Sequence, residues 1–225
     1  MHGVFITGTS TEVGKTYIGT LLAEALVEKN ITVIPRKPIE SGCEISNGEL
    51  MPSDAQALKA ACGYQGRLNE VCPYRFAPPV SPARAARLAG QTVTIEQLAA
   101  ACVDESENGF MLVEGAGGFY SPLCDDGLNA DLAVALQLPV LLVANNALGV
   151  INQVLLNAEA INRRGLQLAA VVLNEIDPSH NQAAEMNNAA DLEAMLDCGI
   201  YVYNARGSAG LPEALIDTVL AQAGR

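Results

Sequence analysis

The sequence predicts an α/β protein in which a mostly parallel central sheet is flanked by helices. Two observations predict this fold class. Short apolar runs alternate with helical patterns along the chain, and several of these runs are apolar throughout, as in 140–144 and 168–173. Continuous apolar runs are typical of strands that are buried on both faces, as in parallel sheets covered by helices. The length of 225 residues fits one domain spanning residues 1–225.

The apolar runs predict strands, in chain order, at residues 3–8, 31–36, 110–114, 139–145, 168–174 and 199–203. Apolar residues recur at helical spacing between them, which predicts helices at 15–29, 53–62, 94–105, 129–137, 150–164, 180–196 and 211–223. Closely spaced prolines oppose regular structure in the segment from about 64 to 92. We therefore expect this segment to be a long functional or interface loop.

The composition excludes several classes of function. The net charge is −12, whereas binding to nucleic acid requires a basic face. The six cysteines form no C-x-x-C pair and only two histidines are present, so we expect no zinc site and interpret the cysteines as core residues or free thiols. No apolar run approaches the ~18–20 residues of a membrane span. With no recognisable signal peptide, these features favour a cytoplasmic protein.

The first apolar run leads into the segment Gly8-Thr-Ser-Thr-Glu-Val-Gly-Lys-Thr16, after which a helical pattern begins. This order of strand, glycine-rich loop and helix is typical of the phosphate-binding loop of a P-loop NTPase, although the loop is one residue longer than usual. Loop N–H groups and the helix N-terminus would surround phosphates. Lys15 would reach the β- and γ-phosphates, and Thr16 would join a Mg²⁺ shell. The alternative is an ordinary turn with a chance Gly-Lys-Thr, which the flanking periodicity disfavours.

Charged residues follow two further predicted strands at their carboxyl ends, where ligands bind in such folds. Lys37 is either a cation that stabilises a transferring phosphoryl group or a solvated surface lysine. Glu114 precedes a glycine-rich turn at 115–118. It is either the carboxylate that holds Mg²⁺ in P-loop ATPases or part of a structural turn. Asp54, near the start of a helical pattern, is either a helix cap or a Mg²⁺ ligand.

Asparagines mark the ends of two more predicted strands. Residues 145–152 begin a helix whose free N–H groups could bind a carboxylate, although a capped turn is the interpretation that the residues alone favour. Asn174 is either a reader of a base edge or a turn residue.

In combination, these segments resemble dethiobiotin synthetase, the ATP-dependent carboxylase of biotin synthesis. The resemblance runs from residue 3 to about 176. It rests on Gly8–Thr16, Lys37-Pro-x-x-Ser-Gly42, Asp54, Ser81-Pro82, Val113–Gly118 and Leu148-Gly-x-Ile-Asn152.

The resemblance implies a cyclo-ligase that converts 7,8-diaminononanoate, CO₂ and ATP into dethiobiotin, ADP and phosphate. One amine captures CO₂ as a carbamate, whose oxygen attacks the γ-phosphate to give a carbamic–phosphoric anhydride. The second amine then closes the ring. Catalysis would rest on positioning and charge stabilisation, since the substrate supplies the nucleophile. The resemblance also implies a homodimer with the substrate site near its interface.

Roles for individual residues follow from motif position in the family. The catalytic residues would be Lys37, Lys15 and Thr11. The Mg²⁺ ligands would be Thr16, Asp54 and Glu114. The substrate would contact Ser41, Thr11, Gly149, Val150 and Asn152, the last three through its carboxylate and across the dimer interface. The nucleotide would contact Glu12, Val13, Gly14, Lys15, Thr16, Tyr17, Asp54, Glu114, Gly115, Ala116, Gly117, Asn174 and Glu175.

Two departures from the family pattern leave questions open. Ala83 stands where the family usually has His, and residues 200–205 lack the usual Ile-Pro, so the purine contacts at 203–205 and the nucleotide preference are not fixed. The main rival is a partner-switching ATPase of the chromosome- or septum-positioning kind. Those proteins typically carry an extra lysine early in the loop, where this chain has Thr9 and Ser10, and often end in a basic helix. The predicted helix at 211–223 contains no Lys or Arg.

Overall fold

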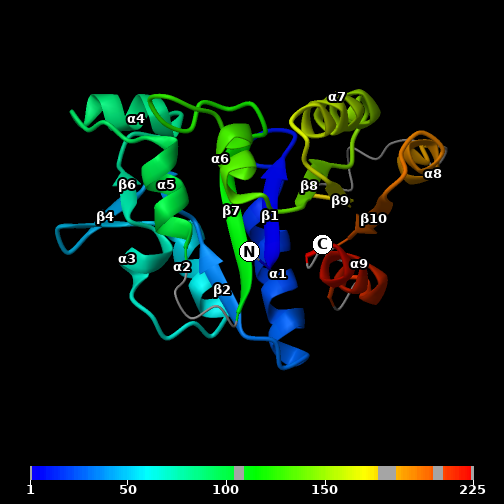
Figure 1. Ribbon diagram of the computed structural model, residues 1–225, viewed down its shortest axis with the longest axis horizontal. Coiled ribbons are helices and arrows are strands. Elements are labelled where there is room, and N and C mark those ends of the chain that lie inside the picture. The colour runs from blue at the N-terminus through cyan, green and yellow to red at the C-terminus, as the bar shows by residue number, and fades with distance from the viewer. Residues whose placement is uncertain (1, 104–108, 177–185, 205–209, 224–225) are drawn as a thin grey trace.

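The computed structural model describes residues 2–103, 109–176, 186–204 and 210–223. Within this part of the chain, six parallel strands form the central sheet in the order β10-β9-β8-β1-β7-β2 (Figure 1). Their bounds are β1 Gly3–Gly8, β2 Val33–Arg36, β7 Phe110–Gly118, β8 Val140–Asn145, β9 Leu168–Asn174 and β10 Gly199–Tyr203. The predicted parallel sheet is therefore confirmed, and all six predicted strands are present.

Helices follow the strands and cover both faces of the sheet (Figure 1). They are α1 Lys15–Glu28, α2 Ser53–Ala61, α3 Leu68–Val71, α4 Pro82–Leu88, α5 Ile95–Cys102, α6 Asn129–Leu136, α7 Val150–Arg163, α8 Asn188–Glu193 and α9 Glu213–Ala223. None of the helices in the described ranges combines the length and apolar character that crossing a bilayer requires.

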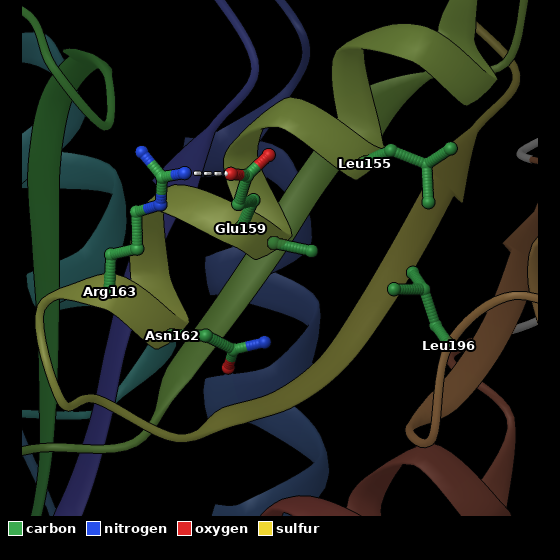
Figure 2. Close-up of a pocket in the computed structure, with 6 residues that line it drawn as sticks. Leu155, Glu159, Asn162, Arg163 and Leu196 are labelled. Carbon is green, nitrogen blue, oxygen red and sulfur yellow. Dashed lines mark ion pairs between the residues drawn. The ribbon is translucent and has the colours of Figure 1, made fainter.

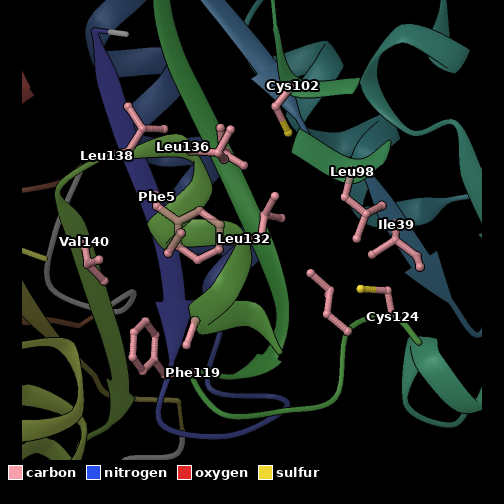
Figure 3. Packing of buried hydrophobic residues seen from close by; sticks show 14 of the residues in the cluster. Phe5, Ile39, Leu98, Cys102, Phe119, Cys124, Leu132, Leu136, Leu138 and Val140 are labelled. Atoms are coloured by element: carbon pink, nitrogen blue, oxygen red, sulfur yellow. The ribbon is translucent and has the colours of Figure 1, made fainter. Parts of the chain in front are cut away.

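Alternate residues of each central strand enter different cores. Val4 and Ile6 of β1 pack with residues of α1, α2 and α9 on one face. Phe5, between them, faces the other side and packs with residues of α5, α6 and α7, among them Leu132 of α6 (Figure 3). Because successive strand residues point to opposite faces, a strand covered on both sides must be apolar throughout. This explains the continuous apolar runs.

Most of the cysteines belong to these cores, as the sequence indicated. Cys43, Cys62, Cys72, Cys102 and Cys124 are buried, and Cys198 is half-buried. Burial raises the pKa of the Cys62 and Cys102 thiols to about 12. These thiols therefore remain protonated and act as small apolar groups.

The expectation that residues 64–92 lack regular structure is wrong. This segment contains α3, a short strand β6 (Tyr74–Phe76) and α4. The prolines are accommodated at element ends: Pro73 precedes β6, and Pro82 occupies the first turn of α4. A helix needs no intrahelical N–H at that position, and the fixed φ of proline suits it.

Short strands that the sequence analysis missed lie between β2 and α2. Strand β3 (Ile39–Ser41) pairs in parallel with β6, and β4 (Glu44–Ser46) forms an antiparallel hairpin with β5 (Glu49–Met51). Asn47 and Gly48 join the hairpin with φ of 52° and 83°, as a tight two-residue turn requires. Three-residue strands are too short to show a period, although the Asn-Gly pair was a usable turn signal.

Several predicted boundaries also change. Strand β7 continues to Gly118, so the glycine-rich segment expected as a turn is the end of a strand. The helix expected at 180–196 is α8 (Asn188–Glu193), and residues 180–185 lie outside the described residues. The Asn187 side chain caps α8 by accepting from the Ala190 N–H, which stabilises the start of this helix at Asn188.

Candidate active site

The loop between β1 and α1 requires left-handed backbone at two positions. Glu12 has a φ of 58° and Gly14, directly before α1, has a φ of 87°. A Cβ at Gly14 would lie 2.2 Å from Nδ2 of Asn174. Only glycine satisfies both the conformation and this close approach. The loop therefore rests against the end of β9, with the first N–H groups of α1 directed into it.

Lys15 begins α1 and is held inside this loop. Its Nζ donates to the Ser10 carbonyl at 3.0 Å. Burial and the nearby charge of Lys37 lower the pKa of Lys15 to about 8. An ammonium group in this environment favours an anionic ligand, because a phosphate would supply negative charge next to a buried cation.

Lys37 follows β2 and is almost completely buried, so it is not the solvated lysine that the sequence left possible. Its Nζ donates to Glu114 Oε1 at 2.6 Å, to the Gly115 carbonyl at 3.1 Å, and to Asp54 Oδ2 at 3.0 Å. Burial alone would lower the pKa of Lys37, but Glu114 and Asp54 outweigh it and the pKa is raised. Lys37 is thus a fixed positive charge.

Asp54 does not cap its helix, which corrects one of the two interpretations of this residue. Helix α2 begins at Ser53 after Pro52, and no side chain of its own caps it. The Asp54 carboxylate instead faces Lys37. Burial would raise the pKa of Asp54, but the charge of Lys37 and the hydrogen bond from it outweigh burial, so the pKa is lowered and Asp54 is ionised.

Glu114 connects this cluster to the phosphate-binding loop. Its Oε1 accepts from Thr16 Oγ1 at 2.9 Å as well as from Lys37. Its Oε2 is buried and has no hydrogen-bond partner among the described residues. A buried carboxylate oxygen without a partner is costly. Thr16, Asp54 and Glu114 thus gather a hydroxyl and two carboxylates, which is a suitable partial donor set for Mg²⁺ when phosphates and waters complete the shell.

Asn129, which the sequence analysis did not single out, fixes the glycine-rich end of β7. The first residue of α6, it is fully buried. Its side chain accepts from the Ala116 N–H at 3.0 Å and donates to the carbonyls of Ala116 and Gly118. A Cβ at Gly115 would lie 2.7 Å from Asn129 Oδ1. In sequence, an asparagine at a helix start looks like an ordinary cap. Its contacts with the distant strand β7 could therefore not be predicted from the neighbouring residues.

These groups open into a cavity of about 750 Å³. The phosphate-binding loop, the end of β7, the segment after β2 and the proline-rich segment at 79–82 surround it. The predicted site residues that line it are Thr11, Glu12, Gly14, Lys15, Thr16, Tyr17, Lys37, Ser41, Asp54, Glu114, Ala116 and Gly117. Glu40, Ser81, Ser121 and Pro122 also line it without having been predicted. Ser41 Oγ donates to the Val80 carbonyl at 2.6 Å, which ties two of these walls together.

Other predicted nucleotide contacts lie outside this cavity lining. Val13 is buried in the core, and Gly115 lies behind the cavity in β7. Asn174 is buried at the end of β9 and donates to the Val13 carbonyl at 3.1 Å. Glu175 accepts from the side chains of Asn146 at 3.2 Å and Asn204 at 2.7 Å.

The predicted contacts to the substrate carboxylate are also separate from the cavity. Gly149 precedes α7 with a φ of 92°, Val150 is buried and Asn152 is exposed. The neighbouring Leu148 is 89% exposed. The Val150 N–H donates to the Ala147 carbonyl at 3.1 Å. The start of α7 thus lies next to an exposed apolar side chain.

Ala83, the departure from the family pattern, is completely buried in α4. A histidine side chain is larger and would need more space at this buried position. In this chain, residue 83 is therefore a small packing residue on the buried side of α4.

A second pocket, of about 550 Å³, lies along α7 (Figure 2). Its lining consists of Leu155, Ala158, Glu159, Asn162, Arg163 and Leu196, and it contains none of the predicted site residues. Arg163 pairs with Glu159 at 2.5 Å. With its charges paired and one turn apart on the same helix, this pocket offers no phosphate-binding group comparable to Lys15.

Known proteins resemble this chain over most of its length. A family model described as an AAA domain matches residues 2–200. ATP-dependent dethiobiotin synthetase BioD of Ruthia magnifica is 37% identical over 91% of this chain and 92% of its own. The enzymes of the same name from Anaeromyxobacter dehalogenans and Chromohalobacter salexigens are 42% and 38% identical, over 84% and 95% of this chain and 83% and 94% of theirs.

Solved structures that resemble the chain at low identity show its fold. The MinC:MinD cell division complex of Aquifex aeolicus matches with a TM-score of 0.56 and 16% identity, over 99% of this chain and 86% of that one. Cell division protein FtsY of Thermotoga maritima matches with a TM-score of 0.54 and 15% identity, over 97% and 68%. These matches confirm the predicted P-loop NTPase fold. Together with the relatives at 37–42% identity, they lead to one conclusion: the chain belongs to the family of ATP-dependent dethiobiotin synthetases.

Proposed function

We propose that this protein catalyses the ATP- and Mg²⁺-dependent carboxylation of 7,8-diaminononanoate with CO₂ and closes the product to dethiobiotin, with release of ADP and phosphate. The observation that carries the proposal is the contact of Lys37 with Glu114 and Asp54 beside the phosphate-binding loop. This cluster puts a fixed cation, two carboxylates and the loop on one cavity.

The chain's residues divide between the two halves of the reaction. The loop and Lys15 bind the phosphates of ATP. Thr11 and Ser41 line the cavity and are proposed to bind the diamine. The carbamate formed on one amine attacks the γ-phosphorus, and the bond to the ADP oxygen breaks. The second amine then attacks the carbamate carbon, closing the ring and releasing phosphate.

Lys37 acts in this proposal as an electrostatic stabiliser rather than as a base. Its raised pKa keeps it protonated, so its Nζ has no lone pair with which to take a proton. A buried ammonium group instead stabilises the negative charge that develops on the carbamate and on the transferred phosphoryl group. Its two carboxylate partners hold it in place before substrate arrives.

Thr16, Asp54 and Glu114 are proposed to hold Mg²⁺ together with the nucleotide. The partnerless Oε2 of Glu114 supports this proposal. When bound, Mg²⁺ neutralises charge on the β- and γ-phosphates and helps orient them. The protein need supply only a few ligands, since Mg²⁺ retains waters and binds phosphate oxygens.

We further propose that a homodimer completes the site. The start of α7, with Gly149, Val150 and Asn152, is outside the cavity lining of its own chain, and Leu148 beside it is highly exposed. Helix N-termini bind carboxylates well, which suits the carboxylate of the diamine bound in the partner chain. Asn174 and Glu175 are proposed to lie on the nucleotide side, near the base.

Incubation of the purified protein with diaminononanoate, bicarbonate and MgATP tests the main proposal. We expect dethiobiotin by mass spectrometry and one phosphate for each dethiobiotin formed. Reactions that lack the diamine provide the control. ADP release no greater than in that control would overturn the proposal.

A further inference from the structure

Glu40 is a buried carboxylate that the proposed reaction does not use. It lies on β3, three residues after Lys37, and lines the active-site cavity while remaining only 5% exposed. Its register partner in β6 is Arg75. Burial raises the pKa of Glu40, while Lys37 opposes this rise. A carboxylate in such a place is costly unless it is well hydrogen-bonded.

The partners of Glu40 lie in the first turn of α2, where the Ser53 hydroxyl donates to Oε1 at 3.4 Å. Its Oε1 accepts from the Asp54 N–H at 3.1 Å, and its Oε2 accepts from the Ala55 N–H at 3.1 Å. Helix N-termini leave such N–H groups without intrahelical partners, and negative charge is favourable there. Because Pro52 precedes α2 and offers no side-chain cap, Glu40 supplies the cap from a different element.

The same helix turn carries the carboxylate of the active site. Asp54 is bound by Glu40 through its backbone N–H and contacts Lys37 Nζ through Oδ2 at 3.0 Å. Glu40 and Lys37 are themselves joined by the short segment Pro38-Ile39. The backbone of Asp54 is therefore fixed by one end of this segment, and its side chain by the other.

We propose that Glu40 is a positioning residue that orients Asp54 toward Lys37 and toward a nucleotide-bound metal ion. The proposal rests on the proposed function in one respect, that Asp54 takes part in binding Mg²⁺ with the nucleotide. Groups that orient metal ligands typically change metal affinity about 10–100-fold when they are altered. Glu40 therefore acts through Asp54 rather than on the substrate.

Binding of ADP with and without Mg²⁺, measured by titration calorimetry, tests this proposal without relying on turnover. The measured quantity is the factor by which Mg²⁺ tightens ADP binding. In Glu40→Gln, one of the two N–H groups of α2 would meet an amide NH₂ instead of an oxygen. We expect the factor to fall about tenfold. Glu44→Gln, at an exposed glutamate of the neighbouring β4, should leave the factor unchanged.

A double-mutant cycle separates positioning from simple stabilisation of α2. Asp54→Asn should reduce the same factor, and adding Glu40→Gln to Asp54→Asn should reduce it no further, because the two residues act through one contact. Independent, multiplicative losses would overturn the proposal. So would a full Mg²⁺ factor in Glu40→Gln.

Two further measurements keep the outcome decisive. If Glu40→Gln does not fold, Glu40→Asp retains the charge but shortens its reach by one methylene, and an unchanged Mg²⁺ factor in that variant would equally overturn the proposal. Dethiobiotin formation by the unsubstituted protein is measured in parallel. Its absence would contradict the proposed function, whereas an active protein with an unaffected Glu40→Gln variant would contradict only the role of Glu40.

Discussion

Lys37 Nζ lies 2.6 Å from Glu114 Oε1, and the two side chains are 3% and 0% exposed. Removing one member of a buried ion pair leaves an uncompensated charge and typically costs about 3–5 kcal/mol. The pair joins the segment after β2 to the end of β7, beside the phosphate-binding loop. A buried ion pair therefore lies at the site where phosphoryl transfer is proposed.

We expect Lys37→Ala to lower kcat by at least about 10²-fold, the loss typical when one preorganised donor is removed from a developing anion. Steady-state phosphate release measures the effect, and circular dichroism verifies that the variant is folded. Lys29→Ala, at the opposite end of α1, is the control. Near-normal turnover of Lys37→Ala would remove Lys37 from the mechanism.

Nucleotide affinity should fall as the pH rises through about 8, because the free loop loses the charge of Lys15 there. ADP binding measured between pH 7 and 9 gives this dependence. The Lys15→Gln variant should bind ADP more weakly at pH 7, and its affinity should depend less on pH.

The effect of Lys15 on the stability of the fold has the opposite sign. With the pKa lowered from 10.5 in the folded state, the unfolded chain binds the proton more strongly, so the contribution of Lys15 to stability rises between pH 8 and 10.5. An affinity for ADP that increases with pH would contradict the role of Lys15 in nucleotide binding.

Gly14→Ala should abolish nucleotide binding. Alanine would have to adopt the left-handed φ of 87°, and its Cβ would lie 2.2 Å from Asn174 Nδ2. Gly48→Ala is a matched control, since its φ is 83° and nothing lies within 4 Å of the added Cβ. Both variants should lose roughly 1–2 kcal/mol from the left-handed conformation, measured by denaturant unfolding. Equal ADP affinity in the two variants would show that the contact with Asn174 does not matter.

Asn129→Ala should loosen the end of β7, because the Ala116 N–H and carbonyl lose the Asn129 side chain as a partner and the Gly118 carbonyl loses one of its two donors, keeping the Ser121 N–H. Leaving a buried backbone group unpaired costs about 1–3 kcal/mol, and for these partly buried groups we expect the lower end of that range. We expect a stability loss of that size by thermal unfolding together with an increased KM for ATP. Asn162→Ala, at an exposed position of α7, should change neither quantity.

The six central strands could be predicted from sequence because each contains a short apolar run, and several of these runs are apolar throughout, as burial on both faces requires. The phosphate-binding loop could be found because its glycines and its lysine are close together in the sequence and act within one loop. Lys37 could be located because it directly follows β2, and Glu114 because it ends the apolar run with which β7 begins. Their mutual contact depends on the strand order, in which β2 and β7 are neighbours.

The remaining features depend on contacts between distant segments. Strands β3 to β6 are too short to show periodicity. Glu40 and Asn129 resemble ordinary polar residues in sequence, and only the fold brings Glu40 to the N-terminus of α2 and Asn129 to the glycines of β7. Asp54 was ambiguous because an acid near a helix start is usually a cap. Here that task belongs to Glu40, and this leaves the Asp54 carboxylate available to Lys37.

The origin of the oxygen in the released phosphate tests the central claim most directly. If a carbamate oxygen attacks the γ-phosphorus, bicarbonate labelled with ¹⁸O must transfer label to phosphate when the ring closes. In reactions kept short relative to the exchange of bicarbonate with water, we predict one ¹⁸O in phosphate for each dethiobiotin formed from labelled CO₂. Dethiobiotin accompanied by unlabelled phosphate would contradict the account.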